Sequence, residues 1–544
     1  MKTRKVQKAR RGTESLRSPI SSRWTQIGFA VLFLHLLLSG ILFSRAMLNS
    51  FEPLKLALLL TAGLTLAALG MMALIQRPRW VDIRRGFLSE GHARWACVGL
   101  LLFLLSAILS TIFSVSPATS WRGFSESSAG LISLLGCFSI FWATRFLVRS
   151  RQDIERLLLA LIMASIVVLG YGILQLLGLD PFEWKRVSLL DGKVRPFSTL
   201  GHPNYLAKWL IMAIPIVAYF TWQSWKSKSS PWKLCSLLTL TILMTIGVVL
   251  TLSRGAMIAM IGAAVFFVIT AFPTARRRIV QGLLALTVLA VLILIWKPTL
   301  ANAVIARGGK LEDAPRLHVW AGSWQVFKEY PITGCGLDTY SFAFAKHQSP
   351  KLSWLEWGHY QSRAHNEVLH ILATHGLVGF LALGVFVVGL GFCASRAIRH
   401  TDPSQRILSI CVCTALVGFA IHSLVSFTII ATAVVFFTLS AVLTRLAEKS
   451  DSPSPIVAKP GLFRGWRVTL QLLVGLIAIW LGFQFVAQPV MAQLTAGEAE
   501  TLAKASSFDK AIERYQEARR LDPHQAIFSR LLAQTWRKKG LSER

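Results

Sequence analysis

Arginine and histidine residues that could do chemistry lie along the longest polar stretch of an otherwise apolar chain. The stretch runs from about residue 297 to residue 366; it contains Arg316, and Arg363, His365 and Asn366 close it. Arginine can bind phosphate oxygens through two parallel hydrogen bonds, and histidine can exchange a proton near neutral pH. A polar segment of this kind, held against apolar helices, indicates chemistry at a membrane surface rather than simple membrane spanning.

Arg254 is a further arginine at a membrane boundary. It lies in the short segment 251–256, where two apolar runs are so close that only a tight reversal can join them. An arginine that faces lipid costs a few kcal/mol, so it must either extend to the interface or face a polar cavity with an anionic partner. Its small neighbours Ser253, Gly255 and Ala256 would let a backbone or a ligand approach closely, which favours a phosphate-facing role. Extension to the interface is the alternative.

The segment 180–204 adds polar residues before another apolar run. It contains Arg195 and ends in Gly201, Pro203 and Asn204, residue types that mark a turn followed by a helix start. Asn204 is expected to cap that helix, and capping can be its whole role.

The residues after Arg316 predict an amphipathic helix. Apolar and aromatic side chains recur there at helical spacing, at Leu317, Trp320, Trp324 and Phe327. The proline and the glycines of residues 330–337 then demand a turn. A cation at a helix start opposes the helix dipole, so Arg316 needs a reason other than helix stability. An isolated histidine is more often structural, and only the convergence of His365 with two arginines favours a catalytic role.

The elements that must position these residues are apolar helices. The 544-residue chain has 53% hydrophobic residues, 15% charged residues and a mean hydropathy of +0.54, which is too apolar for an ordinary soluble protein. Runs near the spanning length of ~20 residues recur thirteen times, at about 24–45, 53–75, 96–115, 129–147, 157–179, 204–222, 235–252, 255–273, 279–297, 367–394, 407–426, 428–446 and 467–488. The predicted fold class is an all-α polytopic membrane protein of about 12–13 transmembrane helices.

Lysine and arginine in the short connections predict the orientation. Basic residues gather in alternate connections, at 1–23, 77–85, 145–151, 226–233, 276–278, 396–406 and 449–467. This side is predicted to be cytoplasmic, which places the loop 297–366 and the C-terminus outside the cytoplasm. The net charge of +32 then reflects topology and contact with anionic lipid of the bilayer, with no role in nucleic-acid binding. The first apolar run is expected to be an uncleaved signal anchor.

The cysteines and carboxylates predict neither a disulfide framework nor a metal site. Of the seven cysteines, only Cys335 lies in the long loop, and the others lie in or beside apolar runs. Cys411 and Cys413 are too closely spaced, in too apolar a context, for a zinc knuckle. The outer segments contain no Asp-x-Asp pair, so we expect no metal and no other cofactor.

The last segment, residues 491–544, is charged and predicted to be helical. Its apolar residues match the 34-residue spacing of tetratricopeptide repeats, at Ala499, Leu502, Phe508, Ala511, Tyr515, Ala518, Pro523, Phe528, Leu532, Ala533 and Trp536. One and a half repeats cannot bury a solenoid core, so this tail is expected to dock on the membrane domain or on a protein partner. The predicted domains are a basic tail 1–23, a membrane domain 24–490 and the tail 491–544.

Between about residues 195 and 385 the sequence resembles the O-antigen ligase and polymerase superfamily of bacterial membrane glycosyltransferases. The similar pieces keep their order around one large loop: Gly201-His202-Pro203-Asn204-Tyr205-Leu206-Ala207, Leu252-Ser253-Arg254-Gly255-Ala256, Arg316 with Trp320 and Trp324, Pro331-Ile332-Thr333-Gly334-Cys335-Gly336, and His365-Asn366 with Leu369 and Gly376-Leu377-Val378-Gly379. The resemblance implies a polyprenol-dependent, GT-C-type helical bundle in the bacterial inner membrane, with the loop folded over it.

Members of this superfamily transfer a glycan from an undecaprenyl-diphosphate-linked donor to a hydroxyl acceptor, without a metal ion. The resemblance implies that Arg254 and Arg316 bind the diphosphate and that His365 assists the acceptor hydroxyl. The further substrate-binding candidates are Arg195, Asn204, Arg363 and Asn366. Two guanidinium groups can stabilise the charge that develops on the diphosphate, as Mg²⁺ does in soluble transferases.

The resemblance leaves the acceptor open among the lipid A core, another glycan and a protein. A ligase-like enzyme ranks first, and a repeat-unit polymerase or a protein O-oligosaccharyltransferase follows closely, because a lipid A core ligase is not expected to need the C-terminal tail. A transporter of a small solute or a lipid-linked sugar is an alternative of another class. Transporters typically carry ionisable residues at the midplane, whereas the polar residues here gather at one face. A scaffold that gathers an envelope complex through the tail is a third possibility.

Overall fold

Apolar helices form most of the structure, as the hydropathy pattern predicts. The computed structural model describes residues 23–76, 91–124, 126–184, 189–190, 193–274, 276–278, 281–282, 315–355, 361–448 and 465–543. Within these ranges the one departure from helices and loops is a short antiparallel hairpin of β1 (Leu189–Leu190) and β2 (Lys193–Val194). The predicted fold class, an all-α polytopic membrane protein, is confirmed.

The long helices of the bundle are α2 (Arg23–Ser39), α3 (Glu52–Gln76), α5 (Ala93–Ile112), α7 (Leu131–Leu147), α8 (Arg151–Leu176), α9 (Pro203–Lys226), α10 (Pro231–Leu250), α11 (Arg254–Ala271), α17 (Glu367–Ala397), α18 (Pro403–Ser423), α19 (Ile430–Ala447) and α20 (Gly465–Gly482). In the described ranges, ten helical segments are long and apolar enough to cross a membrane, and α2 and α7 are shorter apolar helices. They match twelve of the thirteen predicted runs. The ninth run, 279–297, falls almost entirely outside the described residues.

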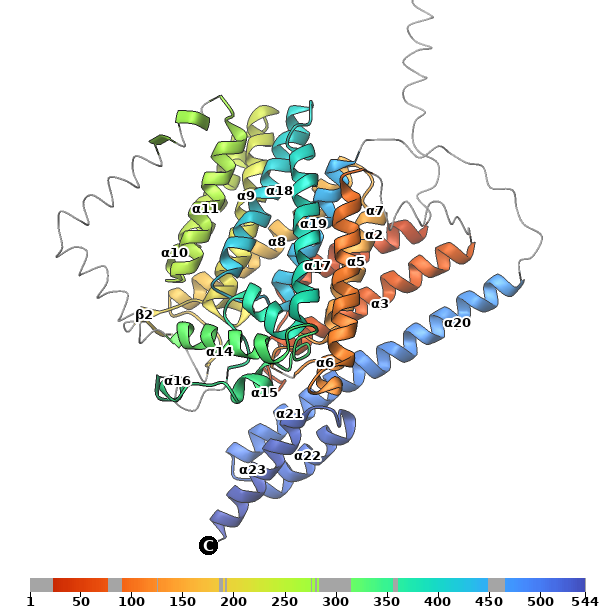
Figure 1. The fold of residues 1–544 in the computed structure, drawn as a ribbon, viewed down its shortest axis with the longest axis vertical. Coiled ribbons are helices and arrows are strands. Elements are labelled where there is room, and N and C mark those ends of the chain that lie inside the picture. Colours follow the sequence, from red (N-terminus) through yellow and green to blue (C-terminus); the bar gives the residue numbers. More distant parts are fainter. Residues whose placement is uncertain are drawn as a thin grey trace, which may run out of the picture.

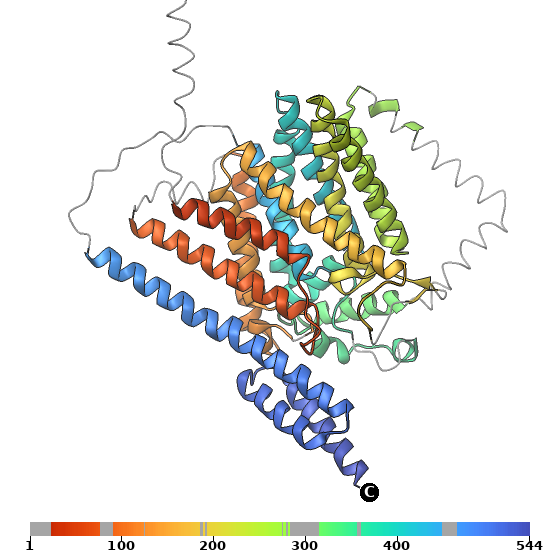
Figure 2. The same cartoon turned by 180° about the vertical axis from the view of Figure 1, so that it is seen from behind.

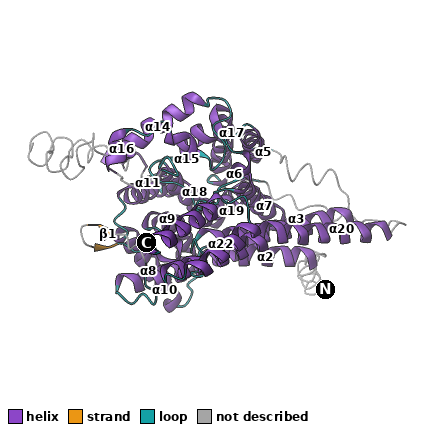
Figure 3. Ribbon diagram, turned by 90° about the horizontal axis from the view of Figure 1, so that it is seen from below, coloured by secondary structure: helices purple, strands orange, loops and turns teal. Residues whose placement is uncertain are grey.

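Short helices lie in the connections at one end of the bundle: α6 (Pro117–Arg122), the 3₁₀ turn η1 (Ser198–Leu200), α14 (Pro315–Glu329), α15 (Tyr340–Ala345) and α16 (Pro350–Leu355). We call this end the loop face. Figure 1 shows α14, α15 and α16 crossing it beneath the long helices. Seen from this face, the three helices cover one side of the bundle, away from α2 and α3 (Figure 3).

Small residues bring the long helices into close contact. A Cβ atom at Gly99 of α5 would lie 2.3 Å from the backbone nitrogen of Phe386, and one at Gly389 of α17 would lie 2.2 Å from that of Ala96. Backbone-to-backbone packing of this kind is typical of membrane helices, where dispersion rather than the hydrophobic effect holds the helices together. Helix α17 is therefore fixed against α5 along its length.

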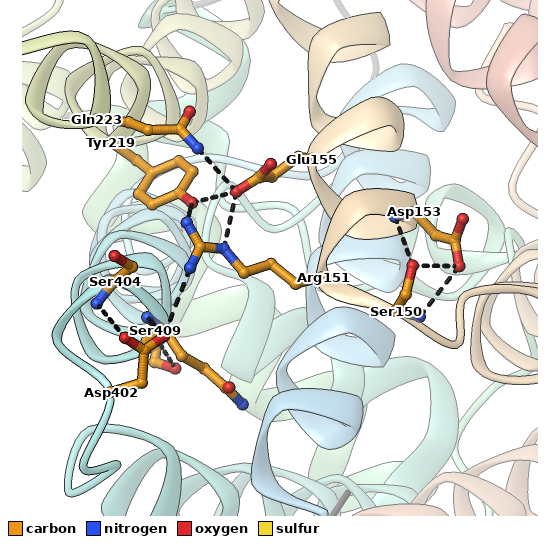
Figure 4. A network of polar contacts seen from close by, with 10 residues as sticks. Ser150, Arg151, Asp153, Glu155, Tyr219, Gln223, Asp402, Ser404 and Ser409 are labelled. Atoms are coloured by element: carbon orange, nitrogen blue, oxygen red, sulfur yellow. Dashed lines mark hydrogen bonds and ion pairs between the residues drawn. The ribbon is translucent and has the colours of Figure 1, made fainter. Parts of the chain in front are cut away.

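A polar network ties three helices together at the end opposite the loop face. Arg151, at the start of α8, donates to Glu155 (2.8 Å), to the Tyr219 hydroxyl of α9 (2.9 Å) and to Asp402 before α18 (3.4 Å). Gln223 of α9 also donates to Glu155 (3.1 Å). Figure 4 shows the Arg151 guanidinium between these partners. The network fixes the far ends of α8, α9 and α18, whose other ends carry the polar residues described below.

The C-terminal helices continue from the bundle without a break. Helix α20 runs beside α3, as Figures 1 and 2 both show, and passes through a π-helical turn, η3 (Phe483–Ala487), into α21 (Gln488–Lys504). The boundary predicted at residue 491 falls inside this continuous segment. Two further helices, α22 (Phe508–Leu521) and α23 (Ala526–Ser542), pack against α21. We call α21, α22 and α23 the C-terminal tail.

Candidate functional site

The turn predicted at residues 330–337 is docked into a break in helix α17. The break lies at Gly376, whose φ of +66° and ψ of −165° interrupt the helix. The N–H groups of Cys335 and Gly336 in the turn donate to two carbonyls just before the break (2.9 and 3.2 Å). Two N–H groups just after the break donate back to carbonyls of the turn (2.8 and 3.2 Å). The loop thus satisfies the backbone groups that the broken helix leaves open, as a membrane-embedded break requires.

We expect Gly376→Ala to destabilise this junction. Its backbone conformation is nearly exclusive to glycine, and a Cβ atom there would lie 2.2 Å from the carbonyl oxygen of Ile332. The expected loss is about 1–3 kcal/mol of unfolding free energy from backbone strain alone, measured as a lower thermal midpoint in detergent. Gly384→Ala is the control, because this glycine of α17 has open space around it. Equal midpoints for the two variants would contradict the docking role.

Helix α14 confirms the helix predicted after Arg316, but the predicted apolar stripe packs only in part: Trp320 and Phe327 are half-buried, and the buried side is formed by Val319, Gly322, Ser323 and Val326. Leu317 and Trp324 are exposed, while Gly322 and Ser323 are buried. Close packing explains the difference. A Cβ atom at Gly322 would lie 2.4 Å from the Phe344 ring. Ser323 also shares a hydrogen bond of 2.7 Å with the Tyr340 hydroxyl. Arg316 lies in the first turn of this helix, with an exposed side chain.

Arg195 and Asn204 meet at the start of α9. The Nε of Arg195 donates to the carbonyl of Thr251 (2.8 Å), and its Nη2 donates to the Asn204 side-chain oxygen (3.5 Å). The prediction that Asn204 caps α9 is wrong. The helix begins one residue earlier, at Pro203, and the Nδ1 of His202 accepts the Asn204 N–H (3.1 Å). Because His202 caps the helix, the Asn204 side chain is turned toward Arg195 instead.

Arg254 begins α11 directly after the reversal that its sequence predicts. The preceding helix ends at Leu250, and Ser253 caps α11 by accepting the Ala256 N–H (3.4 Å). Gly255 is needed for packing, because a Cβ atom there would lie 2.4 Å from the Val425 side chain. Arg254 is exposed and shares this turn with the Thr251 carbonyl that Arg195 binds. The structure therefore places the two arginines on neighbouring segments of the loop face.

His365 and Arg363 pack on one aromatic ring. Phe427 lies in the connection between α18 and α19; the His365 ring meets it edge-on at 5.2 Å, and the Arg363 guanidinium lies 5.5 Å from its centre. Tyr205 of α9 packs on the same ring at 5.3 Å. His365 has a left-handed φ of +53°, which is uncommon outside glycine and marks a constrained position. Asn366 follows as the cap of α17, where its side-chain oxygen accepts the Leu369 N–H (3.1 Å).

Positive charge surrounds the histidines of this region. Burial, with the charges of Arg316 and then Arg363, lowers the pKa of His365 to about 4. Burial is also the largest cause of the low pKa of His202, about 4, and Arg195 is the next. Burial and the Arg316 charge lower the pKa of Arg195. These residues therefore lie within electrostatic range of one another, and His365 is neutral at pH 7. The positive charge of the arginines makes the region suited to attract an anion.

Three buried charged residues beneath this cluster were not predicted. Lys208 of α9 donates to the Ser423 hydroxyl (3.1 Å) and to the Phe427 carbonyl (3.0 Å), and so fixes the connection on which His365 rests. Lys55 donates to the Thr199 carbonyl (2.8 Å). Glu52, the first residue of α3, accepts the backbone N–H of Ile430 (3.3 Å). The sequence could have indicated these residues, because each is a charged residue within the first two turns of an apolar run, where a charge that faces lipid is costly.

Comparison with known families identifies part of this arrangement. Residues 239–384 match the O-antigen ligase family. The matched segment contains Arg254, Arg316, Arg363, His365 and Asn366 together with the second part of α10, all of α11 and the first half of α17, and it ends before α18. No curated protein matches the chain.

Proposed function

We propose that the chain transfers a glycan from an undecaprenyl-diphosphate-linked donor to a hydroxyl acceptor, because its residues 239–384 match the O-antigen ligase family and place it in the O-antigen ligase and polymerase superfamily. The chain is a multi-pass membrane protein, and an enzyme of the ligase or polymerase type. The proposed location is the bacterial inner membrane, with the N-terminus cytoplasmic and the loop face and C-terminus outside the cytoplasm. A lipid A core, another glycan and a protein are the candidate acceptors.

The observation that carries this proposal is the cationic cluster on the loop face. Arg195, Arg316 and Arg363 come from three separate segments; Arg195 acts on His202, Arg363 acts on His365, and the charge of Arg316 acts on both histidines. Asp338 offsets part of the charge at Arg363, and an anion bound between the three segments would further lower the cost of holding like charges together. A diphosphate carries the opposite charge and offers several acceptor oxygens to guanidinium groups. The cluster therefore fits the diphosphate of a lipid-linked donor at the membrane surface.

In the proposed reaction the acceptor hydroxyl attacks C1 of the donor sugar. A new C1–oxygen bond forms while the C1–O bond to the diphosphate breaks, and the electron pair of that bond leaves on the diphosphate. His365 takes the hydroxyl proton, and Arg316 with Arg254 stabilises the charge that develops on the leaving group. A single displacement of this kind inverts the configuration at C1. The products are the glycosylated acceptor and undecaprenyl diphosphate.

The charges of the cluster link donor binding to the pKa of His365, the proposed base. Without an anion, burial, together with the charges of Arg316 and Arg363, holds the pKa of His365 at about 4, so its neutral imidazole is a weak base. A bound diphosphate would place negative charge beside the same arginines and raise this pKa, and a base is most effective when its pKa lies near the working pH. Donor binding is thereby proposed to strengthen His365 as a base.

The pH dependence of the two kinetic constants should reveal this coupling. His365 works only when neutral, so activity is present above its pKa and is lost as the pH falls through it. The acid limb of kcat/KM for the donor reports the free enzyme and is expected near pH 4, the pKa of His365 without an anion. The acid limb of kcat reports the donor complex and is expected about 1–3 units higher. Coincident acid limbs would contradict the coupling.

The function itself is tested by comparing cells that make the wild-type chain with cells that make only an inactive variant. We expect one class of glycan-bearing lipid or protein to disappear and the undecaprenyl-linked donor to accumulate. The class that disappears identifies the acceptor. Unchanged glycans together with an unchanged donor pool would contradict the proposal, and flux of a solute through proteoliposomes without glycan transfer would favour transport instead.

A further inference from the structure

The C-terminal tail is seated on the loop face by specific contacts. The N–H of Leu48, in the connection between α2 and α3, donates to the carbonyl of Gln493 in α21 (3.1 Å). Gly497 approaches the same connection so closely that a Cβ atom would lie 2.1 Å from the Ala46 carbonyl oxygen. The buried core of the tail also packs against Leu48. The tail is thus part of the membrane domain's surface in this structure.

A second contact joins the tail to the turn after α6. Asp522, between α22 and α23, pairs with Arg122 at 3.3 Å, and its side chain is 5% exposed. Gln525 donates to the carbonyl of Gly123, the next residue of that turn (3.2 Å). The Arg122 guanidinium also lies 5.4 Å from the ring centre of Phe485, in the π-helical turn that leads into the tail. Residues 122 and 123 are therefore contacted by the connection between α22 and α23, and Arg122 is also contacted by the π-helical turn before the tail.

The same turn holds a buried carboxylate of the long loop. The N–H groups of Phe124 and Ala129 donate to Oδ2 of Asp338 (2.6 and 3.0 Å), and the Ser127 hydroxyl donates to Oδ1 (2.6 Å). The Asp338 side chain is 2% exposed, so these bonds fix its position. Burying a carboxyl group is unfavourable unless its oxygens are hydrogen-bonded, and these three donors supply those bonds.

Asp338 in turn faces Arg363. The Arg363 Nη2 lies 3.9 Å from Oδ1 of Asp338, and both side chains are buried. Arg363 is the guanidinium that packs with His365 on Phe427 and contributes to the low pKa of His365. A continuous series of contacts therefore runs from Asp522 in the tail, through the turn after α6, to Asp338 and the candidate site.

We propose that the C-terminal tail positions the substrate site, with Asp522, Arg122 and Asp338 as positioning residues for Arg363. This inference rests on the proposed glycan transfer and assigns the tail a role within that reaction. Contacts from the tail fix the turn after α6, and the N–H groups of this turn bind Asp338. Asp338 in turn orients the Arg363 guanidinium beside His365. Loss of the contact between the tail and this turn lets Arg363 move away from the donor diphosphate.

The test is kinetic and uses the full-length chain in detergent, with the lipid-linked donor that accumulates in cells lacking activity as the probe. Asp522→Asn keeps the shape of the side chain and removes the charge that pairs with Arg122. The expected result is a rise of about 3- to 30-fold in the donor KM, the range found for residues that modulate a distant site. Asp522→Glu restores the charge and is expected to return KM most of the way to the wild-type value.

Two comparisons separate positioning from simple destabilisation. Glu517→Gln is the matched control, because Glu517 belongs to the tail but pairs with Arg514 on its own helix; its KM should equal that of the wild type. The Arg122→Gln/Asp522→Asn double variant should raise the donor KM no more than Arg122→Gln alone, because Arg122→Gln already breaks the pair with Asp522 as well as the contact with Phe485. A lower thermal midpoint with an unchanged donor KM would overturn the inference. If the wild-type chain transfers no glycan, the proposed function itself fails.

Discussion

His365→Ala is expected to lower the rate of glycan transfer by about 10²- to 10⁴-fold, the usual contribution of a positioned general base. His365 lies on the loop face, is neutral at pH 7, and is held by the edge of Phe427 beside two arginines that act on its pKa. No proton acceptor replaces the imidazole in the alanine variant, so the acceptor hydroxyl must lose its proton to water. Transfer in isolated membranes and accumulation of the lipid-linked donor measure the effect.

His365→Gln is a second variant that keeps a side chain of similar size on Phe427, and it should lose as much activity as His365→Ala. The matched control is His347→Ala. His347 belongs to the same long loop, but its ring pairs with Glu329 at 2.6 Å at the protein surface. His347→Ala should keep the wild-type thermal midpoint, and transfer by the two His365 variants is compared below their own midpoints, because the left-handed φ of this position strains most side chains. Product formed at the wild-type rate by His365→Ala would exclude the general-base role.

Patterns local in sequence predicted most of the fold. A run of apolar side chains of spanning length has few alternatives to a helix in a bilayer, so twelve predicted runs coincide with apolar helices of the described residues. The reversal before Arg254 and the turn at residues 330–337 followed from spacing and from glycine and proline. The loop could be identified as the part of the chain that carries candidate residues because it is the longest polar stretch between the apolar runs.

Features that depend on contacts between distant segments could not be predicted. The packed side of α14 is set by Gly322 against Phe344, and no apolar periodicity reveals a glycine that allows close approach. His202 caps α9 in place of Asn204, and the Asn204 side chain instead accepts a hydrogen bond from Arg195, a residue of another segment. The pairing of Asp338 with Arg363 depends on a turn more than 200 residues earlier in the chain. Such partners become visible only once the chain is folded.

Arg316→Ala is expected to lower transfer by about 10²- to 10³-fold, the loss that follows removal of one group that stabilises charge in the transition state. Arg316 begins α14 with an exposed side chain, yet its charge reaches Arg195, His202 and His365. It thus lies where the three segments of the cluster converge. Arg316→Lys should lose less, because it keeps the charge but not the planar fork that binds two phosphate oxygens.

Lys328→Ala is the control for Arg316→Ala, since Lys328 is a cation in the last turn of the same helix. It should leave both transfer and the donor KM unchanged. Arg316 is exposed, so neither substitution should alter the thermal midpoint by more than a small amount. If arginine side chains stabilise the leaving diphosphate, transfer by the wild-type enzyme also persists in EDTA. Transfer that EDTA abolishes and Mg²⁺ restores, with Arg316→Ala at the wild-type rate, would assign that task to a metal ion instead.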